Sequence, residues 1–342
     1  ELMNIVVNGT ANFHVALPQV GEAVAPRPPQ PNGHVVRVEK KLRFDPKYGS
    51  RPGYDSRFLA GFDVPAPKGP HGEVLRQGDE PHVLDYHNYS LVMHRKRRLV
   101  MWAASNVDYD PDKRWRQREE FGDDTWKPDP RIPIEAQIED VEFYDPAKKF
   151  DRGHIVRRDD VAWGSTRLRE EYGNSDSFHW TNCTPQHEGF NRDAFGYHGL
   201  WGQLENHIAK QAGFVQDKLI ILAGPVLSPA DPSRDFGSGI SVQVPIAFWK
   251  VVLAVEDTQP HRTLRAYGFV LDQGEAIDEY GWEGRFKVGK FKEHQVSIAE
   301  ITALSRVTFD GVVHDADPLK NAGPGPESRR RPLASLESIR LR

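Results

Sequence analysis

Two apolar segments joined by a basic turn constrain the fold of this 342-residue chain more than any other sequence feature. Residues 89–94 and 98–104 are rich in apolar side chains, and Arg95, Lys96 and Arg97 lie between them. Two strand-like segments separated by a short polar turn are typical of a β-hairpin, whose strands are antiparallel. Further strand-like segments follow at residues 218–222, 241–255 and 265–271. The sequence therefore predicts an antiparallel sheet.

An amphipathic helix is expected between the strand-like segments. Residues 199–212 carry Leu200, Trp201, Leu204 and Ile208 at spacings that place them on one side of a helix. A helix with one apolar face must bury that face against another element. The sequence therefore predicts a mixed α+β domain.

The N-terminal part of the chain has a different pattern. Its first twenty residues alternate apolar and polar side chains, which predicts one or two strands. Residues 21–81 are rich in Pro and Gly, which favours an extended arm over a second core. We therefore expect an N-terminal strand and arm at 1–84, a folded domain at 85–312 and a loosely ordered tail at 313–342 that ends in a short helix.

Composition excludes several classes of protein. The one cysteine, Cys183, can form no internal disulfide and no cysteine-rich zinc site. The net charge of −4 means that any surface for a polyanion must be local. Since no apolar run is long enough for a membrane span and no secretory signal is visible, we expect a cytoplasmic protein with no membrane partner.

One short motif brings together groups that suit phosphodiester hydrolysis. Asp151, Arg152, Gly153 and His154 are consecutive, and Arg157 and Arg158 follow closely. That reaction needs a base to activate water, a cation on the phosphate and further positive charge for the transition state. The motif supplies an imidazole, a carboxylate and several guanidinium groups.

Further elements follow this motif in a fixed order: residues 181–186 (Thr-Asn-Cys-Thr-Pro-Gln), then Phe190-Asn191, then residues 200–205, which end in Glu205. With these elements the sequence resembles the DNA/RNA non-specific endonuclease family, the ββα-metal nucleases of the Serratia nuclease and endonuclease G type. Residues 222–226 and 244–251 look like later core strands of that family, so the resemblance covers about residues 85–310. It implies a central antiparallel sheet with flanking helices that carries a ββα-metal (His-Me finger) element on one face.

The resemblance also implies roles for individual residues. His154 would be the general base, and Asn191 would be the protein ligand of a hydrated Mg²⁺, with Mn²⁺ as an alternative. Glu205 would orient a metal-bound water, and Asp151 would act in the same way. Glu205 lies fourteen residues after Asn191, farther than the family usually places its glutamate, so an insertion is expected between them.

The other polar residues of the motifs would support this centre. Arg152 would contact phosphate or brace the site, Asn182 would fix the His154 loop, and Arg157 and Arg158 would contact nucleic acid. A clamp on the phosphate is expected from an upstream arginine. Among Arg114, Arg116, Arg118 and Arg131 we select Arg118, because it precedes Phe121 and residues 126–130 in the family's order.

Four histidines raise the question of a zinc site. His179, His187, His198 and His207 lack a sharp ligand spacing, so we interpret them as packed or surface residues. The sequence thus predicts a Mg²⁺-dependent endonuclease that cuts DNA and RNA with little sequence preference. The alternative is a catalytically silent domain that binds nucleic acid or a protein. A homodimer, a regulatory protein and a covalently linked upstream domain all stay open as partners.

Overall fold

The computed structural model describes two compact units, Glu1–Glu39 and Lys40–Arg342. The described residues are 2–7, 11–16, 43–115, 121, 125–194, 197–215, 218–258, 261–274, 276–277, 294–321 and 330–332. In the first unit, β1 (Leu2–Val7) pairs antiparallel with β2 (Ala11–Ala16). This confirms the strands expected within the first twenty residues.

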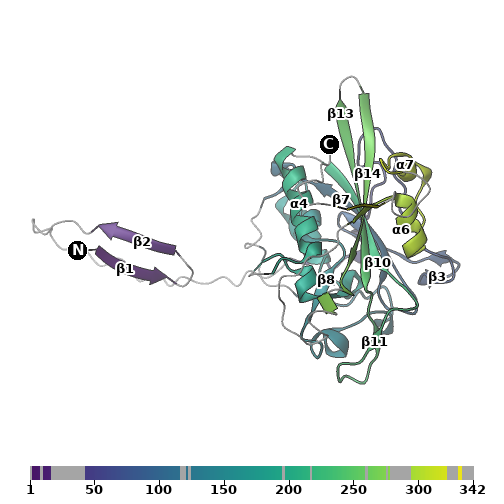
Figure 1. Cartoon of the computed structure of the whole chain (residues 1–342), viewed down its shortest axis with the longest axis horizontal. Helices are drawn as coiled ribbons and strands as arrows, with labels where there is room; N and C mark the ends of the chain where they lie inside the picture. The colour runs from purple at the N-terminus through teal and green to yellow at the C-terminus, as the bar shows by residue number, and fades with distance from the viewer. Residues whose placement is uncertain are drawn as a thin grey trace, which may run out of the picture. The chain divides into compact units, whose positions relative to one another are not determined.

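The second unit is built around an antiparallel sheet of eight strands (Figure 1). Their order across the sheet is β16-β15-β14-β13-β10-β7-β6-β5. The strands are β5 (Val83–Tyr86), β6 (Tyr89–Met93), β7 (Val100–Asp108), β10 (Lys218–Val226), β13 (Ala247–Thr258), β14 (His261–Asp272), β15 (His294–Val296) and β16 (Arg330–Pro332). The predicted antiparallel α+β architecture is confirmed, including the β6–β7 hairpin.

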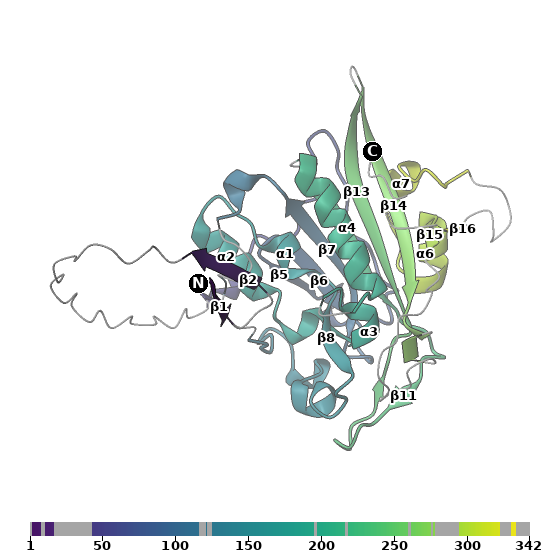
Figure 2. The same ribbon diagram turned by 60° about the vertical axis from the view of Figure 1, so that its left-hand side comes forward.

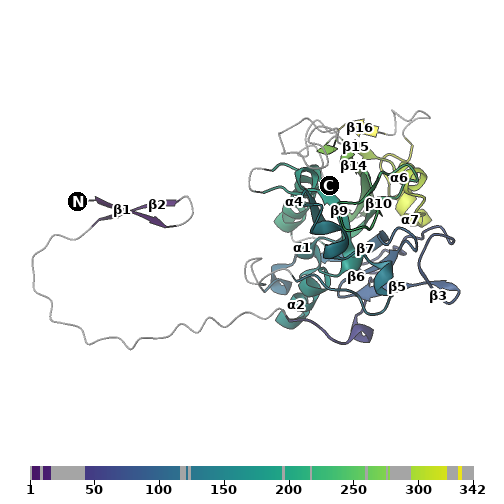
Figure 3. The same cartoon turned by 90° about the horizontal axis from the view of Figure 1, so that it is seen from below.

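Helices cover both faces of this sheet. Helix α4 (Leu200–Val215) lies against one face, and α6 (Ile298–Ser305) and α7 (Gly311–Asp315) lie against the other (Figure 1). Figures 2 and 3 show that α1 (Arg158–Val161) and α2 (Arg167–Asp176) lie on the α4 side. We call these the α4 face and the α6 face. The helix predicted at 199–212 is therefore confirmed as α4.

Strand β13 contributes to both faces through its two-residue periodicity. Phe248 and Val252 belong to the core cluster of the α4 face, together with residues of α4. Trp249 and Val251 belong to the cluster of the α6 face. Because alternate side chains of a strand point to opposite faces, Lys250 falls on the α4 face, within an otherwise apolar row.

Shorter elements complete the second unit. Strand β8 (Phe150–His154) pairs antiparallel with β9 (Cys183–His187), and α3 (Glu188–Asn191) follows β9 directly. The others are η1 (Tyr48–Ser50), β3 (Arg76–Gln77), β4 (Glu80–Pro81), η2 (Pro111–Lys113), η4 (Ile134–Ala136), η5 (Asp140–Tyr144), η6 (Trp180–Asn182), β11 (Ser233–Arg234) and β12 (Val242–Gln243). None of the helices among the described residues has the length and apolar character needed to cross a membrane.

Residues 43–84, which were assigned from the sequence to the N-terminal arm, contribute buried side chains to the second unit. Leu59, Val64 and Val74 are buried in the cluster of the α6 face, so residues 43–84 belong to the second unit. The regular elements of this segment are short, but its apolar side chains are still buried. Residues 17–42, where the Pro-rich arm was also expected, lie outside the described residues.

Described residues beyond 313, which were assigned from the sequence to the tail, also contact the second unit. The Asp317 carboxylate accepts a hydrogen bond of 2.8 Å from the amide of Ile298, at the start of α6. Strand β16 pairs with β15 at the edge of the sheet. The helix expected at the end of the chain falls at residues 333–342, outside the described residues.

Candidate active site

Strands β8 and β9 with helix α3 form a ββα unit that carries most of the predicted site. In the register of the pair, Gly153 lies opposite Thr184 and His154 opposite Cys183. A Cβ atom on Gly153 would lie 2.2 Å from Oε1 of the buried Gln186. The glycine of the motif is therefore needed for the two strands to pack.

A buried glutamine joins this unit to the main sheet. The Gln273 side chain accepts a hydrogen bond of 2.7 Å from the amide of His187 and donates to the carbonyl oxygens of Pro185 and Pro245. Gln273 follows β14 directly, so β9 is fixed to the end of a core strand. The position of α3, and with it Asn191, depends on this link.

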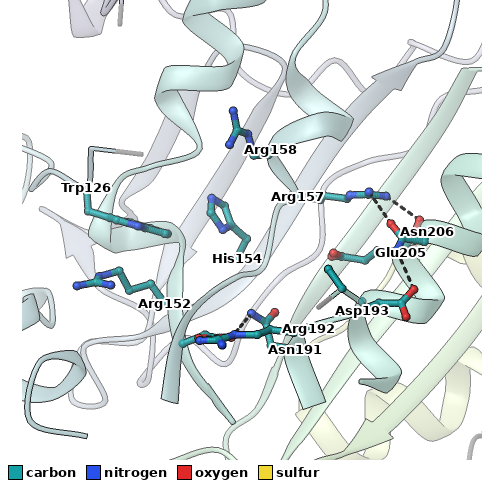
Figure 4. A pocket seen from close by; sticks show the side chains of 13 residues that line it. Trp126, Arg152, His154, Arg157, Arg158, Asn191, Arg192, Asp193, Glu205 and Asn206 are labelled. Carbon is teal, nitrogen blue, oxygen red and sulfur yellow. Dashed lines mark hydrogen bonds and ion pairs between the residues drawn. The ribbon is translucent and has the colours of Figure 1, made fainter. Parts of the chain in front are cut away.

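The ββα unit and helix α4 enclose a pocket of about 500 Å³ (Figure 4). It gathers residues that lie far apart in the sequence. The predicted site residues that line it are Asp151, Arg152, His154, Arg157, Arg158, Asn191 and Glu205. In the view of Figure 4, His154 and Trp126 lie on one side and Glu205 and Asn206 on the other.

Two aromatic rings hold the His154 imidazole at the end of β8. The ring centroid of Trp126 lies 4.7 Å away at an interplanar angle of 51°. The centroid of Phe178 lies 5.0 Å away, with its ring nearly perpendicular. These contacts restrict the rotation of the imidazole, and His154 is one of the residues that line the pocket.

Asn182 fixes the backbone that follows His154. Its amide oxygen accepts from the amide of Val156 at 2.9 Å, and its amide nitrogen donates to the carbonyl of the same residue at 2.9 Å. Asn182 is fully buried and does not line the pocket. Its geometry suits the predicted support of the His154 loop and no direct contact with substrate.

An ion pair orients Asn191 at the end of α3. Its Nδ2 donates to Asp151 Oδ2 at 2.9 Å, and Arg192 donates to both oxygens of the same carboxylate. Because Asn191 Nδ2 donates to Asp151, the amide oxygen Oδ1 is the atom of this side chain that can bind a cation. Asp151 therefore positions Asn191, and Arg192 balances the charge of Asp151.

A second ion pair holds Glu205 on helix α4. Lys250 Nζ donates to Glu205 Oε1 at 2.8 Å, and the side chain of Lys250 is only 1% exposed. Burial raises the pKa of the Glu205 carboxyl, and the positive charge of Lys250 opposes that shift. The Lys250 ammonium also lies 4.2 Å from the centroid of the Trp201 ring. Glu205 thus lines the pocket, and the buried Lys250 ammonium compensates its charge.

The other arginines of the pocket are held by neighbours. Arg152 donates to Asp140 and, at 3.3 Å, to Asp145. Arg157 donates to the carbonyl of Glu205 at 2.8 Å and to Asn206 Oδ1 at 2.7 Å, and Arg158 donates to Asn174 Oδ1 at 3.1 Å. Their guanidinium groups are fixed before any substrate binds, which is typical of preorganised positive charge.

The upstream phosphate clamp is not placed by the structure. Arg118 and Arg116 lie outside the described residues. Arg131 is paired with Asp129 at 2.6 Å, and Arg114 donates to the carbonyl oxygens of Asp108 and Asp159. Neither Arg114 nor Arg131 lines the pocket.

The histidines considered for zinc do not converge. No cluster of three or more His, Cys, Asp and Glu side chains able to hold a metal ion occurs among the described residues. His179 is fully buried, and its Nε2 lies 2.9 Å from the hydroxyl of Tyr48. This agrees with the interpretation of His179 as a packed residue.

Several residues of the site were not predicted from the sequence. Arg192, Asp193 and Trp126 line the pocket, and Lys250 lies directly behind Glu205. For Lys250 a signal was present, since a lysine in a twelve-residue strand of mainly apolar residues is expected to have a buried partner. The other residues carry no comparable local signal.

Comparison with known proteins identifies the family. The family model described as DNA/RNA non-specific endonuclease matches residues 71–316. The chain belongs to this family. The match includes every element of the ββα unit and helix α4.

Two curated relatives match this member of the endonuclease family. Uncharacterized protein y4fB of Sinorhizobium fredii (strain NBRC 101917 / NGR234) is 31% identical over 312 residues, which are 86% of this chain and 44% of that protein. Nuclease 1, mitochondrial, of Schizosaccharomyces pombe is 24% identical over 205 residues, which are 57% of this chain and 58% of that protein. The chain thus spans about half the length of the curated relatives it matches.

A solved structure of the EndoG/EndoGI complex, concerned with the mechanism of EndoG inhibition, is also similar. It is 18% identical, with a TM-score of 0.48, and the match covers 69% of this chain and 87% of the compared chain.

Proposed function

We propose that this protein is an endonuclease that hydrolyses phosphodiester bonds of DNA and RNA with little sequence preference. The observation that carries the proposal is the meeting of His154, Asn191 and Glu205 with several arginines in one pocket. A base, oxygen donors and fixed positive charge together suit attack by water on a phosphate.

His154 acts as the general base in this proposal. Its imidazole takes a proton from the attacking water, whose oxygen forms a new bond to phosphorus. The bond from phosphorus to the 3′-oxygen breaks, and that oxygen takes a proton from solvent. The products are a 5′-phosphate and a 3′-hydroxyl. The rings of Trp126 and Phe178 support this role, because they limit the orientations of the imidazole.

The donors of the pocket suit a hard divalent cation such as Mg²⁺. The amide oxygen of Asn191 is a hard oxygen ligand on the pocket wall, and the carboxylates of Asp151 and Glu205 line the same pocket. Asn191 would hold the ion directly, with Asp151 and Glu205 oriented behind it. Bound there, Mg²⁺ would supply positive charge to the phosphate oxygens, and Mn²⁺ could take its place.

Arginine side chains of the pocket stabilise the negative charge that develops on the phosphate oxygens in the transition state. Arg152, Arg157, Arg158 and Arg192 all line the pocket. Guanidinium groups bind phosphate oxygens in a bidentate way without reading base edges. Contacts of this kind support cleavage that tolerates different sequences and weakens as the salt concentration rises.

The proposal is tested by digesting a supercoiled plasmid and a structured RNA in the presence of Mg²⁺ or EDTA, with wild-type protein and His154→Ala. We expect Mg²⁺-dependent nicking of both substrates by the wild type, and a loss of about 10²- to 10⁴-fold in the variant, the range for a general base. Circular dichroism checks that the variant is folded.

Equal cleavage by the two proteins would overturn the assignment of His154. Binding of nucleic acid by the wild type without nicking at any divalent cation tested would instead support a silent nucleic-acid-binding domain.

A further inference from the structure

A segment outside the family match packs against the loop that supports His154. Residues 43–51, here called the strap, precede the matched region, which begins at residue 71. The strap crosses residues 176–182, here called the platform loop, which connects α2 to β9. The contacts between them are buried and polar.

Arg51 anchors the strap to the start of the platform loop. Its Nε and Nη2 donate to the two carboxylate oxygens of Asp176, each at 2.9 Å, and both side chains are fully buried. Its Nη2 also donates to the carbonyl of Asp45 at 2.9 Å. A bidentate ion pair shielded from water fixes both partners in one relative orientation.

Tyr48 reaches the middle of the platform loop. Nδ1 of His179 lies 2.7 Å from the carbonyl oxygen of Asp176, which can only accept, so Nδ1 carries the proton. Nε2 of the neutral ring is then an acceptor, and the Tyr48 hydroxyl donates to it at 2.9 Å. Burial, and then the charge of Lys127, lower the pKa of His179 to about 4, so the ring is neutral near pH 7.

The platform loop is hydrogen-bonded to the backbone that follows His154. The amide of Asn182 donates to the carbonyl of His179 at 2.8 Å. The amide of Ile155 in turn donates to the carbonyl of Asn182 at 3.2 Å, and the Asn182 side chain holds Val156 from both sides. Ile155 is the residue after His154. A continuous chain of hydrogen bonds therefore joins Tyr48 to the backbone beside the proposed base.

The platform loop also carries the aromatic wall of the imidazole. Phe178 packs against His154, and its carbonyl accepts from the amide of Lys127 at 3.0 Å. The amide of Trp180 donates to the carbonyl of Lys127 at 3.0 Å, which places the neighbouring Trp126 against His154. Movement of the platform loop would thus shift both rings that hold the imidazole.

We propose that Tyr48 and Arg51 are positioning residues for His154, which makes the strap an added part of the catalytic scaffold of this protein. The inference rests on the proposed function, because positioning matters only if His154 acts as a base. The strap touches no substrate; it acts through His179 and Asn182. A displacement of about 1 Å at a catalytic group can lower a rate by about 10²-fold, so a lost hydrogen bond in this chain has a measurable effect.

The test compares Tyr48→Phe with Tyr54→Phe. Each variant loses one hydroxyl, but Tyr54 donates to the carbonyl of Val64 and packs against the cluster of the α6 face. For Tyr48→Phe we expect kcat to fall about tenfold with KM unchanged within about twofold. Faster hydrogen exchange is expected at the amides of Ile155 and Val156. Tyr54→Phe is expected to change neither quantity.

A second variant keeps the test decisive if Tyr48→Phe folds poorly. Arg51→Lys retains the positive charge and loses the bidentate geometry, so we expect the same fall in kcat and the same local increase in exchange. Unchanged kcat and exchange in a folded Tyr48→Phe protein would overturn the inference, as would equal effects from Tyr54→Phe. If the wild type does not cut nucleic acid, the proposed function fails, while the exchange data still report whether the strap orders the loop.

Discussion

Strand β13 presents different side chains to the two faces of the sheet. On the α6 face, Trp249 and Val251 belong to one hydrophobic cluster with apolar residues of α6 and α7. On the α4 face, Lys250 lies between Phe248 and Val252 and pairs with Glu205. One face is closed by hydrophobic packing, whereas the other includes an ion pair that borders the pocket. The difference indicates that the site is built by placing charges inside one half of a common core.

The ion pair between Lys250 and Glu205 carries an unfavourable desolvation free energy, which the apolar cluster of the α6 face does not. Removing two charges from water is unfavourable, and their attraction offsets this only when both partners are present. Replacing a buried ion pair by well-packed apolar residues of similar volume often leaves the free energy of unfolding unchanged or raises it. The presence of Lys250 and Glu205 at this place therefore points to a role in the chemistry of the pocket.

The largest effect in this comparison is expected for Lys250→Met. Removing one partner of a buried ion pair leaves Glu205 without its hydrogen-bonded cation, so the free energy of unfolding should fall by about 3–5 kcal/mol. Loss of a residue that orients a group of the site should also reduce cleavage per folded molecule by roughly 10- to 100-fold. Denaturant unfolding and plasmid cleavage measure the two quantities.

A matched change on the other face provides the control. Val251 is fully buried beside Lys250 on the same strand. Val251→Ala should lower the free energy of unfolding by about 2 kcal/mol and leave cleavage per folded molecule unchanged. If both variants reduce cleavage equally, the α4 face does not have a special role in cleavage.

The fold could be predicted from the sequence where the signal is local. The β6–β7 hairpin was predicted from two apolar segments joined by a basic turn, and α4 from the three- and four-residue spacing of its apolar side chains. The motif around His154 was visible because Asp151, Arg152 and Gly153 are consecutive with it. For residues 43–84, a composition rich in Pro and Gly indicates short regular elements but does not indicate whether side chains such as Leu59 and Val64 are buried.

The partners of the site residues could not be predicted in the same way. Glu205 meets Lys250 only because β13 passes behind α4, and Arg51 meets Asp176 across more than a hundred residues. Arg192 is adjacent to Asn191, but its pairing with Asp151 depends on how α3 packs against β8. Such contacts are set by the tertiary fold, and a single sequence contains no spacing rule for them.

Acidification is expected to weaken the platform loop before it weakens α6, and this effect is smaller than the effects of the substitutions above. The pKa of His179, which faces Lys127, Asp129, Asp176 and Tyr48, is lowered by burial to about 4. The unfolded state therefore binds more protons than the folded state between about pH 6.5 and pH 4. The contribution of the neutral His179 ring to the free energy of unfolding is fully present above about pH 6.5 and is lost as the pH falls. Asp317 beside α6 has a pKa raised by burial, so its contribution changes in the opposite direction.

Hydrogen exchange at pH 6.5, 5 and 4 measures this difference. Protection at residues 176–182 should decrease first, and protection in α6 should persist to lower pH. Loss of protection in α6 before the platform loop would contradict the predicted order.

The most direct test of the account is a crystal structure of His154→Ala with a DNA duplex and Mg²⁺. We predict that one phosphate of the uncut strand lies in the pocket, with the metal about 2.1 Å from the amide oxygen of Asn191. The space left by the imidazole should lie on the opposite side of that phosphorus. A metal bound without contact to Asn191, or a phosphate that cannot be reached from position 154, would contradict the account.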